Sequence, residues 1–333
     1  MKVAVIGAGS FGTALGKLLA ENRHDVYVWS HSLDTAQAIR EKRENTIYLP
    51  GFPLPENLRV SHELGEVLYK SELVVFAVPT QVARSVIEQM CPQLPRSAII
   101  VSASKGIERG TLCLLADIFV EILGTENKKR LFFLSGPSFA REVAMRFPTA
   151  VTIAGYSLEE IGVVQAAFHN EYFRVYASND VIGVELGGAL KNVIALAAGI
   201  SDGLGLGHNS RAALITRGLA EIARLGQAMG AHPLTFMGLA GMGDLVLTCT
   251  GDLSRNRSVG LEIGRGKTLK EVMEHMRMVA EGVPTTESAY ELARKKEVEM
   301  PITEAVYDIL YRHESPREAM RKLMTRRLKQ ELG

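Results

Sequence analysis

The sequence predicts a two-domain α/β protein in which a doubly wound, largely parallel sheet is followed by an all-helical domain. Short β-branched runs alternate with helical patterns in the first half, a glycine-rich motif follows the first of these runs, and no convincing strand occurs after Asn179. Strands that alternate with helices are typical of βαβ units, which bind ligands at the carboxyl ends of the strands. We therefore expect an N-terminal doubly wound Rossmann-type domain and an all-α C-terminal domain.

The first domain is expected to span residues 1–179 and to bind a dinucleotide. It begins with a strand over Lys2–Ile6, a helix over Phe11–Glu21 that has one apolar face, a strand over Asp25–Trp29 and a helix over Leu33–Arg43. The later strands expected in this domain are Leu73–Val78, Ala98–Ser102, Leu131–Ser135, Ala150–Ala154 and Phe173–Tyr176.

The second domain is expected to span residues 180–333 and to carry substrate and catalytic residues. A chain of 333 residues is comfortable for two domains. The helices expected here are Asp180–Ile200, Ser210–Met229, Arg257–Gly264, Leu269–Met276, Thr285–Lys296, Pro301–Leu310 and Pro316–Lys329.

Composition and charge exclude several classes of protein. The net charge is +1, so no global field points to nucleic acid, and any recognition of anions must be local. The three cysteines are far apart and form no CxxC pair, which predicts no metal site and reduced thiols. The most apolar stretch, residues 181–207, carries three charged residues and many glycines, so we expect no stable membrane insertion.

The glycine-rich motif Gly7-Ala8-Gly9-Ser10-Phe11-Gly12 has the spacing GxGxxG. It follows a strand and opens an amphipathic helix, which is the context that dinucleotide binding requires. Gly7 permits the tight turn, Gly9 lets the backbone approach a pyrophosphate, and Gly12 lets the helix pack closely on the strand. The alternative, a glycine-rich turn without a ligand, is disfavoured by this context.

The end of the second strand discriminates between NAD and NADP. An acid there would bind the ribose 2′-hydroxyl, but this chain has Trp29-Ser30-His31, and Asp25 lies at the start of the strand. A 2′-phosphate is therefore tolerable, with Ser30, His31 and Arg40 or Arg43 as candidate contacts. NADPH is favoured, although His31 is also compatible with a plain surface histidine.

Lys191 lies on an unusual face of the helix expected over Asp180–Ile200. With a period of 3.6 residues it shares that face with small and apolar side chains, which usually indicates burial. Burial disfavours the charged form of a lysine, so its pKa should fall toward neutrality and suit proton transfer. The other open interpretation is a lysine that covers apolar surface with its stem and keeps its ammonium in water.

Two loops that follow strands add further candidates. Lys105 comes just after the carboxyl end of the strand at Ala98–Ser102, at the edge where a doubly wound sheet binds ligands. The loop Gly136-Pro137-Ser138-Phe139-Ala140 follows another strand and could close over substrate or nicotinamide with its backbone N–H groups. Taken alone, Lys105 is also compatible with a solvated loop lysine, and the second loop with a simple turn.

A local anion site is expected near residues 251–257. Ser254 is a plausible N-cap for the helix that follows, and Arg255 can bind phosphate oxygens in a bidentate manner beside the helix N-terminus. A capped, solvated loop is the alternative. Asp244 follows small and apolar residues and could orient a lysine or a substrate hydroxyl, while Glu281 could reach the cofactor.

Together these motifs resemble bacterial NAD(P)-dependent glycerol-3-phosphate dehydrogenase over nearly the whole chain. The resemblance rests on VIGAGSFGTALG at 5–16, FAVPTQ at 76–81, SASKGIE at 102–108, LSGPSFAREV at 134–143, ELGGALKNVIALAAGISDGLGLG at 185–207, AGMGDLVLTC at 240–249, SRNR at 254–257 and VAEGVPT at 279–285. It implies interconversion of sn-glycerol 3-phosphate and dihydroxyacetone phosphate with NAD or NADP, supply of phospholipid synthesis, and a cytoplasmic homodimer.

The resemblance also implies roles for matching positions. Lys191 corresponds to the proton acceptor of the family. The positions that match substrate-binding residues are Lys105, Gly136, Ser138, Lys191, Asp244, Ser254, Arg255 and Asn256. The positions that match cofactor-binding residues, apart from the three glycines, are Ser10, Phe11, His31, Lys105, Ala140, Arg255, Val279 and Glu281. Asn192 and Thr248 align with polar positions near the substrate, whereas His31 replaces the arginine that many relatives carry.

Two other functions fit part of the sequence. Dehydrogenases of 3-hydroxy acids and sugar acids also join a Rossmann domain to a helical domain with a catalytic lysine and asparagine, and a carboxylate could use the anion site. The second alternative is a regulatory module that senses a dinucleotide and has no catalytic activity. Intact Lys105, Lys191 and Asp244 argue against it, because a sensor need not keep them.

Overall fold

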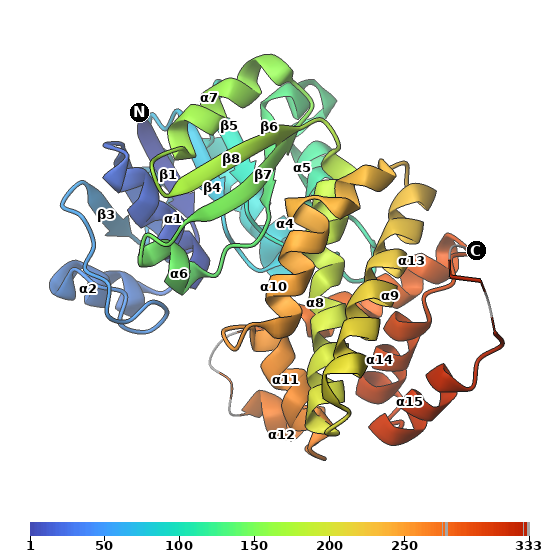
Figure 1. The fold of residues 1–333 in the computed structure, drawn as a ribbon. Coiled ribbons are helices and arrows are strands. Elements are labelled where there is room, and N and C mark those ends of the chain that lie inside the picture. The colour runs from blue at the N-terminus through green and yellow to red at the C-terminus, as the bar shows by residue number, and fades with distance from the viewer. Residues whose placement is uncertain (275, 277–278, 329, 332–333) are drawn as a thin grey trace.

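The computed structural model describes residues 1–333 except 275, 277–278, 329 and 332–333, and it shows a sheet domain followed by a helical domain (Figure 1). The sheet has eight strands in the order β3-β2-β1-β4-β5-β6-β7-β8. Their bounds are β1 Lys2–Ile6, β2 Asp25–Trp29, β3 Leu58–Ser61, β4 Leu73–Phe76, β5 Ile99–Ser102, β6 Leu131–Ser135, β7 Thr149–Gly155 and β8 Phe173–Ser178.

The sheet domain confirms the doubly wound prediction. The strand order reverses between β1 and β4, so the carboxyl ends of these two strands flank a crevice of the kind that binds dinucleotides. The helices that connect the strands are α1 Ser10–Glu21, α2 Leu33–Lys42, α3 Leu64–Leu68, α4 Thr80–Met90, α5 Leu115–Leu123, α6 Ala140–Ala144 and α7 Leu158–Phe168.

Two features of the sheet differ from the expectation. The strand β3 was not predicted, because its sequence Leu58-Arg59-Val60-Ser61 lacks the continuous apolar run that marks the equally short β4 and β5. The alternation of strands and helices indicated parallel βαβ units, but β6 and β7 pair antiparallel, while β7 and β8 pair parallel. The segment between β6 and β7 contains only the five-residue helix α6, whereas a parallel connection usually crosses over through a longer helix.

The helical domain confirms the all-α prediction, because no strand follows β8 among the described residues. The prediction missed α10 and the adjoining π-helical turn Leu239–Gly243, since their glycines and short length resemble a loop. The predicted ends at Met276 and Lys329 lie next to or among residues outside the described set. The helices are α8 Val181–Gly203, α9 Gly207–Ala228, α10 Asp244–Thr250, α11 Arg255–Gly264, α12 Leu269–Glu274, α13 Gly282–Lys295, α14 Pro301–Tyr311 and α15 Pro316–Met324.

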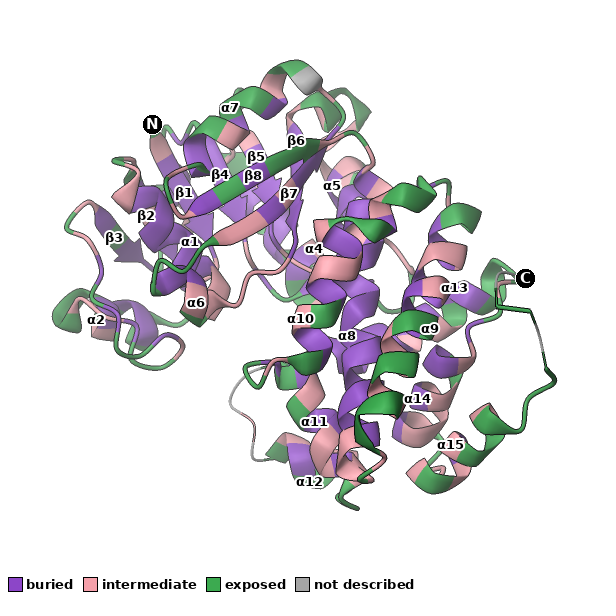
Figure 2. Cartoon of the chain, in the orientation of Figure 1, coloured by how far each residue is buried: buried purple, intermediate pink, exposed green. Residues whose placement is uncertain are grey.

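Helix α8 is the central element of the helical domain. Figure 2 shows it buried between the other helices, and nearly all of its residues are inaccessible to solvent. By length and composition alone α8 could cross a membrane, but 94% of its apolar window is buried inside the protein. Its apolar composition is therefore explained by its position in the core, where a helix is hydrophobic on all sides.

Glycines allow α8 and α11 to pack with their backbones close together. A Cβ atom on Gly199 or Gly203 of α8 would meet backbone carbonyls of α11, and a Cβ on Gly260 or Gly264 of α11 would meet carbonyls of α8. The chain therefore needs glycine at all four positions to bring the helix that carries Lys191 against the helix that begins at Arg255.

We predict that Gly260→Ala lowers the free energy of unfolding by about 1–3 kcal/mol, because its Cβ would press on the carbonyl of Leu196. The matched control is Gly162→Ala in α7, where a Cβ meets no atom within 4 Å and alanine should stabilise the helix by about 0.5–1 kcal/mol. Thermal and denaturant unfolding of the two variants measure this. Equal stability of the two variants would contradict the packing account.

Candidate active site

The glycine-rich loop has the geometry of a dinucleotide cradle. Gly7 adopts a φ of +116°, where L side chains are strained, and its N–H bonds the carbonyl of Trp29 at 3.1 Å. Gly9 is the N-cap of α1 with no side chain capping the helix, and a Cβ on Gly9 would meet no atom within 4 Å. A pyrophosphate could therefore approach Gly9 and the N-terminus of α1, where Ser10 and Phe11 begin the helix. The glycine-rich loop and the start of α1 therefore fit the pyrophosphate of a dinucleotide.

A loop that was not predicted as functional holds the glycine-rich loop in place. The Asn45 side chain is 1% exposed and donates to the carbonyl of Ala8 and to the hydroxyl of Thr13, both at 2.8 Å. Ser10 donates its hydroxyl to the carbonyl of Tyr48 at 2.6 Å. A lone asparagine and a tyrosine carbonyl leave no recognisable pattern in a sequence, so only the structure reveals this anchor.

The end of β2 presents His31 to solvent, beside the Trp29 ring at 6.0 Å between centroids. Arg40 is exposed, whereas Ser30 is buried and donates its hydroxyl to the carbonyl of Ser32. Arg43 is not available for a 2′-phosphate as the sequence suggested, because its guanidinium donates to the carbonyls of Leu54, Pro55 and Leu58. His31 and Arg40 remain the accessible candidates.

The centre of the site is one carboxylate shared by two lysines. Asp244, the first residue of α10, is fully buried. Its Oδ2 accepts from Lys105 Nζ at 2.7 Å, and its Oδ1 forms an ion pair with Lys191 Nζ. Thr248, one turn later in α10, donates its hydroxyl to the Asp244 carbonyl at 2.6 Å. Lys105 comes from the sheet domain and the other three from the helical domain, so this contact joins the two domains.

Burial and charge set the ionisation of this cluster. Burial lowers the pKa of Lys191 to about 8, although the Asp244 charge opposes the shift; the charge of Lys105 lowers it further. Burial alone would raise the pKa of Asp244, but the two lysines outweigh burial and lower it. Asp244 is thus ionised at neutral pH, and Lys191 can gain or lose a proton near physiological pH. The sequence interpretation of Lys191 as a buried lysine is correct.

The loop after β6 lies against Lys105. The Gly136 carbonyl accepts from Lys105 Nζ at 3.3 Å and from the Ser138 hydroxyl at 2.9 Å. Lys105 Nζ also lies 5.9 Å from the centre of the Phe11 ring, which belongs to the glycine-rich helix. Ala140 then begins α6, which packs against α1. The loop therefore links the lysine pair to the dinucleotide cradle.

The start of α11 carries the residues that the sequence suggested for an anion site. Ser254 is the N-cap, as expected, and its hydroxyl accepts from the Arg257 N–H at 3.2 Å. Asn256 is buried and internally satisfied: its amide donates to Asn192 Oδ1 at 2.8 Å and accepts from the Gly282 N–H at 2.9 Å. Asn256 thereby connects α11 to the residue after Lys191. Arg255 remains exposed, with one N–H on the Val279 carbonyl at 2.9 Å.

Glu281 has a carboxyl oxygen without a hydrogen-bond partner among the described residues, although that atom is buried. Burial raises its pKa to about 7, while the Thr80 N–H and the charge of Arg255 oppose the shift. The exposed Val279 lies two residues before it. Arg255, Val279 and Glu281 therefore gather at one place, with a polar group that has capacity for another partner.

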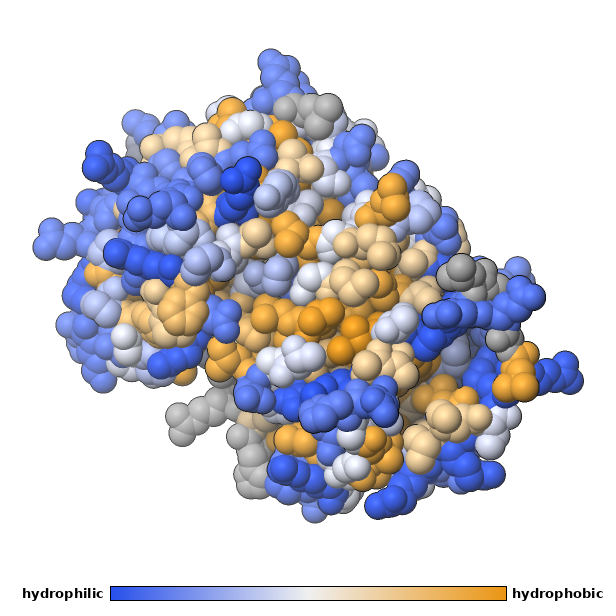
Figure 3. All heavy atoms as spheres, viewed as in Figure 1, coloured by the Kyte–Doolittle hydropathy of each residue, from blue (hydrophilic) through white to orange (hydrophobic). Residues whose placement is uncertain are grey.

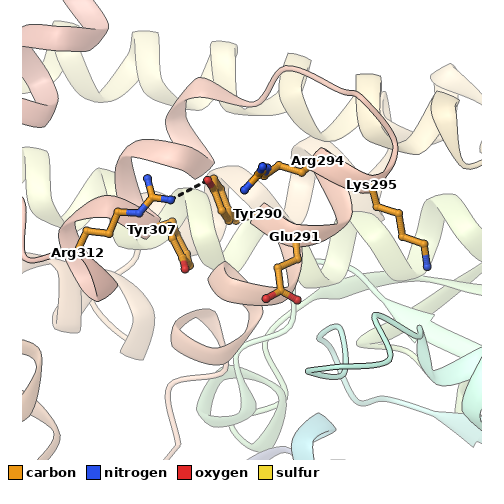
Figure 4. A pocket seen from close by; sticks show the side chains of 6 residues that line it. All are labelled: Tyr290, Glu291, Arg294, Lys295, Tyr307 and Arg312. Carbon is orange, nitrogen blue, oxygen red and sulfur yellow. Dashed lines mark hydrogen bonds between the residues drawn. The ribbon is translucent and has the colours of Figure 1, made fainter.

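A separate hollow of about 460 Å³ lies on the surface of α13 and α14 and contains none of the predicted residues. The rings of Tyr290 and Tyr307 stack there at 4.0 Å, and Arg312 donates to the Tyr290 hydroxyl (Figure 4). Its lining residues are Tyr290, Glu291, Arg294, Lys295, Tyr307 and Arg312. Among the described residues, no group of three or more His, Cys, Asp or Glu side chains is placed to hold a metal ion.

Fold and site together define the class of protein. A glycine cradle at the point where the strand order reverses serves a dinucleotide, and a lysine with a pKa near 8 serves proton transfer beside it. These are the two functions that an NAD(P)-dependent oxidoreductase combines.

Comparison with known proteins identifies the family. The model of the NAD-dependent glycerol-3-phosphate dehydrogenase N-terminus matches residues 2–160, and that of its C-terminus matches residues 180–321. The chain belongs to the NAD-dependent glycerol-3-phosphate dehydrogenase family, as the resemblance indicated. A glycerol-3-phosphate dehydrogenase [NAD(P)+] of Citrifermentans bemidjiense is 59% identical, with 99% of this chain and 98% of that protein covered. One of Myxococcus xanthus is 52% identical, with 100% and 99% covered.

Solved structures agree with this family assignment. The crystal structure of glycerol-3-phosphate dehydrogenase from Coxiella burnetii has a TM-score of 0.93 at 40% identity and covers 97% of this chain and 98% of that one. A D-mandelate dehydrogenase with NADH scores 0.63 at 12% identity and covers 96% and 100%. This second likeness shows a shared fold alone. The predicted enzyme class and the use of NAD or NADP are confirmed.

We predict that Asp244→Asn destabilises the protein by about 3–5 kcal/mol, because it leaves two lysines beside a buried neutral amide. The control is Asp252→Asn, whose carboxylate pairs with Arg257 but is 96% exposed, and which should cost at most about 1 kcal/mol. Thermal unfolding near neutral pH compares the two. An Asp244→Asn variant as stable as the control would show that the shared carboxylate contributes little.

Proposed function

We propose that Lys191 is the proton donor and acceptor in the interconversion of sn-glycerol 3-phosphate and dihydroxyacetone phosphate. In reduction, Lys191 gives a proton from Nζ to the oxygen on C2 of dihydroxyacetone phosphate; in oxidation it takes the proton back. The observation that carries this proposal is its burial against Asp244, which leaves Lys191 with a pKa of about 8. General acid–base assistance of this kind contributes roughly 10²–10⁴-fold.

Lys105 and Asp244 serve the same step in different ways. Lys105 forms an ion pair with the carboxylate and polarises the C2 oxygen as negative charge develops on it. Asp244 holds both ammonium groups in place through its two oxygens. Because the carboxylate binds one lysine from each domain, it also fixes the distance between the proton donor and the polarising group.

The phosphate of the substrate is bound at the start of α11. Arg255 supplies the charge, and the N-terminus of the ten-residue helix adds its dipole. Ser254 and Asn256 shape this end of the helix through the cap and the bond to Asn192. Gly136 and Ser138 complete the substrate site from the sheet side, next to Lys105.

The dinucleotide lies across the carboxyl ends of β1 and β4. Bound there, NADPH or NADH supplies the hydride for C2 of the substrate. Gly7, Gly9 and Gly12 with Ser10 and Phe11 form its cradle, while Lys105, Ala140, Arg255, Val279 and Glu281 flank it. NADPH is favoured, since His31 and Arg40 are accessible and no acid stands at the end of β2; the ratio of kcat/KM for NADPH and NADH measures this preference.

The wider assignment follows from the same role. Residues 1–179 form the dinucleotide-binding domain and residues 180–333 the substrate and catalytic domain, in a cytoplasmic enzyme that supplies glycerol 3-phosphate for phospholipid synthesis.

A homodimer is supported by apolar side chains exposed on the helical domain. Leu234, Met237 and Val246 are 70%, 61% and 39% exposed, and Figure 3 shows apolar atoms gathered on this face around α10. Light scattering of the purified chain measures the assembly.

The proposal predicts opposite pH profiles for the two directions. Reduction requires protonated Lys191, so its kcat/KM should be level below pH about 8 and fall above it; oxidation requires the neutral amine and should rise up to pH about 8. Lys191→Met should lower kcat in both directions by roughly 10²–10⁴-fold and remove this inflection. Stopped-flow absorbance of the nicotinamide at several pH values gives both profiles.

Lys17→Met is the control for this test. Lys17 is another buried lysine in an ion pair, with Glu21 of α1, but it has no contact with the lysine cluster. Its loss should affect stability and leave both pH profiles unchanged. Profiles of the same slope in both directions would reject Lys191 as the proton carrier.

Arg255→Ala should remove a charge-assisted contact to the substrate phosphate worth about 1.5–3 kcal/mol. The kcat/KM for dihydroxyacetone phosphate should then fall by about 10- to 150-fold, while that for unphosphorylated dihydroxyacetone should not. Arg265→Ala, at the exposed far end of α11, is the matched control. An equal loss on both substrates would show that Arg255 does not bind phosphate.

A further inference from the structure

A small cavity lies behind Lys105, in the joint between the two domains. It is enclosed by the ends of β5 and β6 on the sheet side and by the first half of α8 on the helical side. The volume open to the centre of a water molecule is about 10 Å³, which leaves room for one water. Residues that line it include Ser102, Lys105, Phe133, Ser135, Glu185 and Gly188.

Two hydroxyl groups on this cavity have no hydrogen-bond partner among the described residues. They belong to Ser102 and Ser135, which are 1% and 3% exposed and end β5 and β6. A buried hydroxyl without a partner costs free energy, and such groups in folded proteins are nearly always bonded to protein or to ordered water. Two such groups on one cavity of this size indicate a shared partner.

Glu185 supplies a third polar group on the wall. Its carboxyl group accepts from the Ala116 N–H at the start of α5, at 3.2 and 3.4 Å from its two oxygens. Burial raises the pKa of Glu185 well above its usual range, so the carboxyl group can donate to a water as well as accept from it. Two hydroxyls and one carboxyl group match the two to four partners that a buried water usually has. The wall of the cavity therefore supplies enough hydrogen-bond partners for one water molecule.

We propose that this cavity is a binding site for one ordered water that bridges Ser102, Ser135 and Glu185, and that this water positions Lys105. The proposal concerns Lys105 as polarising group, so its kinetic part rests on the function proposed above. Ser102, Ser135 and Glu185 are positioning residues, since they act on the substrate only through Lys105.

The geometry shows how the water reaches Lys105. A Cβ placed on Gly188 would lie 2.6 Å from the Ser135 hydroxyl and 3.5 Å from both Cγ and Cδ of Lys105, so the lysine stem and the cavity meet at one point of α8. The residue after Ser135 is Gly136, whose carbonyl accepts from Lys105 Nζ. The water thus fixes both the wall on which the stem rests and the strand end that holds its ammonium.

The first test is a crystal structure of the full wild-type chain at high resolution. We expect a density peak within hydrogen-bond distance of both serine hydroxyls and the Glu185 carboxyl group, and its loss in Ser102→Ala/Ser135→Ala. A dry cavity in the wild type, or hydroxyls bonded only to protein, would overturn the proposal. This test needs no catalytic activity, so it stands even if dihydroxyacetone phosphate is not the substrate. The wild-type structure decides it alone, whether or not the double variant folds.

The second test is the pH profile of reduction for the double variant. A loosened Lys105 should lower kcat by about 3- to 10-fold. The fall in kcat/KM for reduction above pH about 8, here called the basic limb, should also move to higher pH. The reason is that a loosened Lys105 no longer lowers the pKa of Lys191 as strongly. A purely structural role would leave that limb in place.

Ser201→Ala is the matched control for the second test. Ser201 is also buried on α8 with an unpartnered hydroxyl, and it lies ten residues, or about 15 Å, from Lys191. This control should leave kcat and the basic limb unchanged. A double variant that folds, keeps wild-type kcat and keeps the limb would overturn the role of the water in positioning Lys105.

Discussion

The buried carboxylate of Asp244 is the interaction on which the site depends. A fully buried aspartate is stable only when charges and hydrogen bonds compensate its lost hydration, and here two ammonium groups do so. In turn, the charge of Asp244 raises the pKa of Lys191 against the burial that lowers it, and the pKa is about 8. Because Lys105 comes from the sheet domain, the complete cluster exists only when the two domains are packed together.

The helical domain is built to hold this cluster at a fixed place. Helix α8 is buried on all sides, and glycines on α8 and α11 allow their backbones to approach. That approach brings Asn256 against Asn192, and thus the start of α11 to the residue beside Lys191. A lysine in the middle of a core helix has little freedom to move, which suits the proposed role of Lys191 as a group that meets one oxygen of the substrate.

Much of this architecture could be predicted from sequence, where local patterns determine it. The alternation of strands and helices gave the doubly wound sheet, the glycine spacing gave the cradle, and the small apolar face gave the buried Lys191. Features set by distant contacts were missed. The strand β3 has no continuous apolar run, and α10 looks like a glycine loop. The carbonyls bound by Arg43 become its neighbours only after folding. The sharing of Asp244 by two lysines likewise depends on tertiary packing between domains.

The most direct test of the shared carboxylate is the ionisation of Lys191 itself. Proteins labelled with ¹³C at lysine Cε give one resonance per lysine, and Lys191→Met assigns the one of interest. Our account predicts that this resonance titrates near pH 8 in the wild type, in the absence of substrate and cofactor. A titration at the ordinary lysine value of 10.5 would contradict it, because Lys191 would then be too fully protonated at neutral pH to exchange a proton with the substrate.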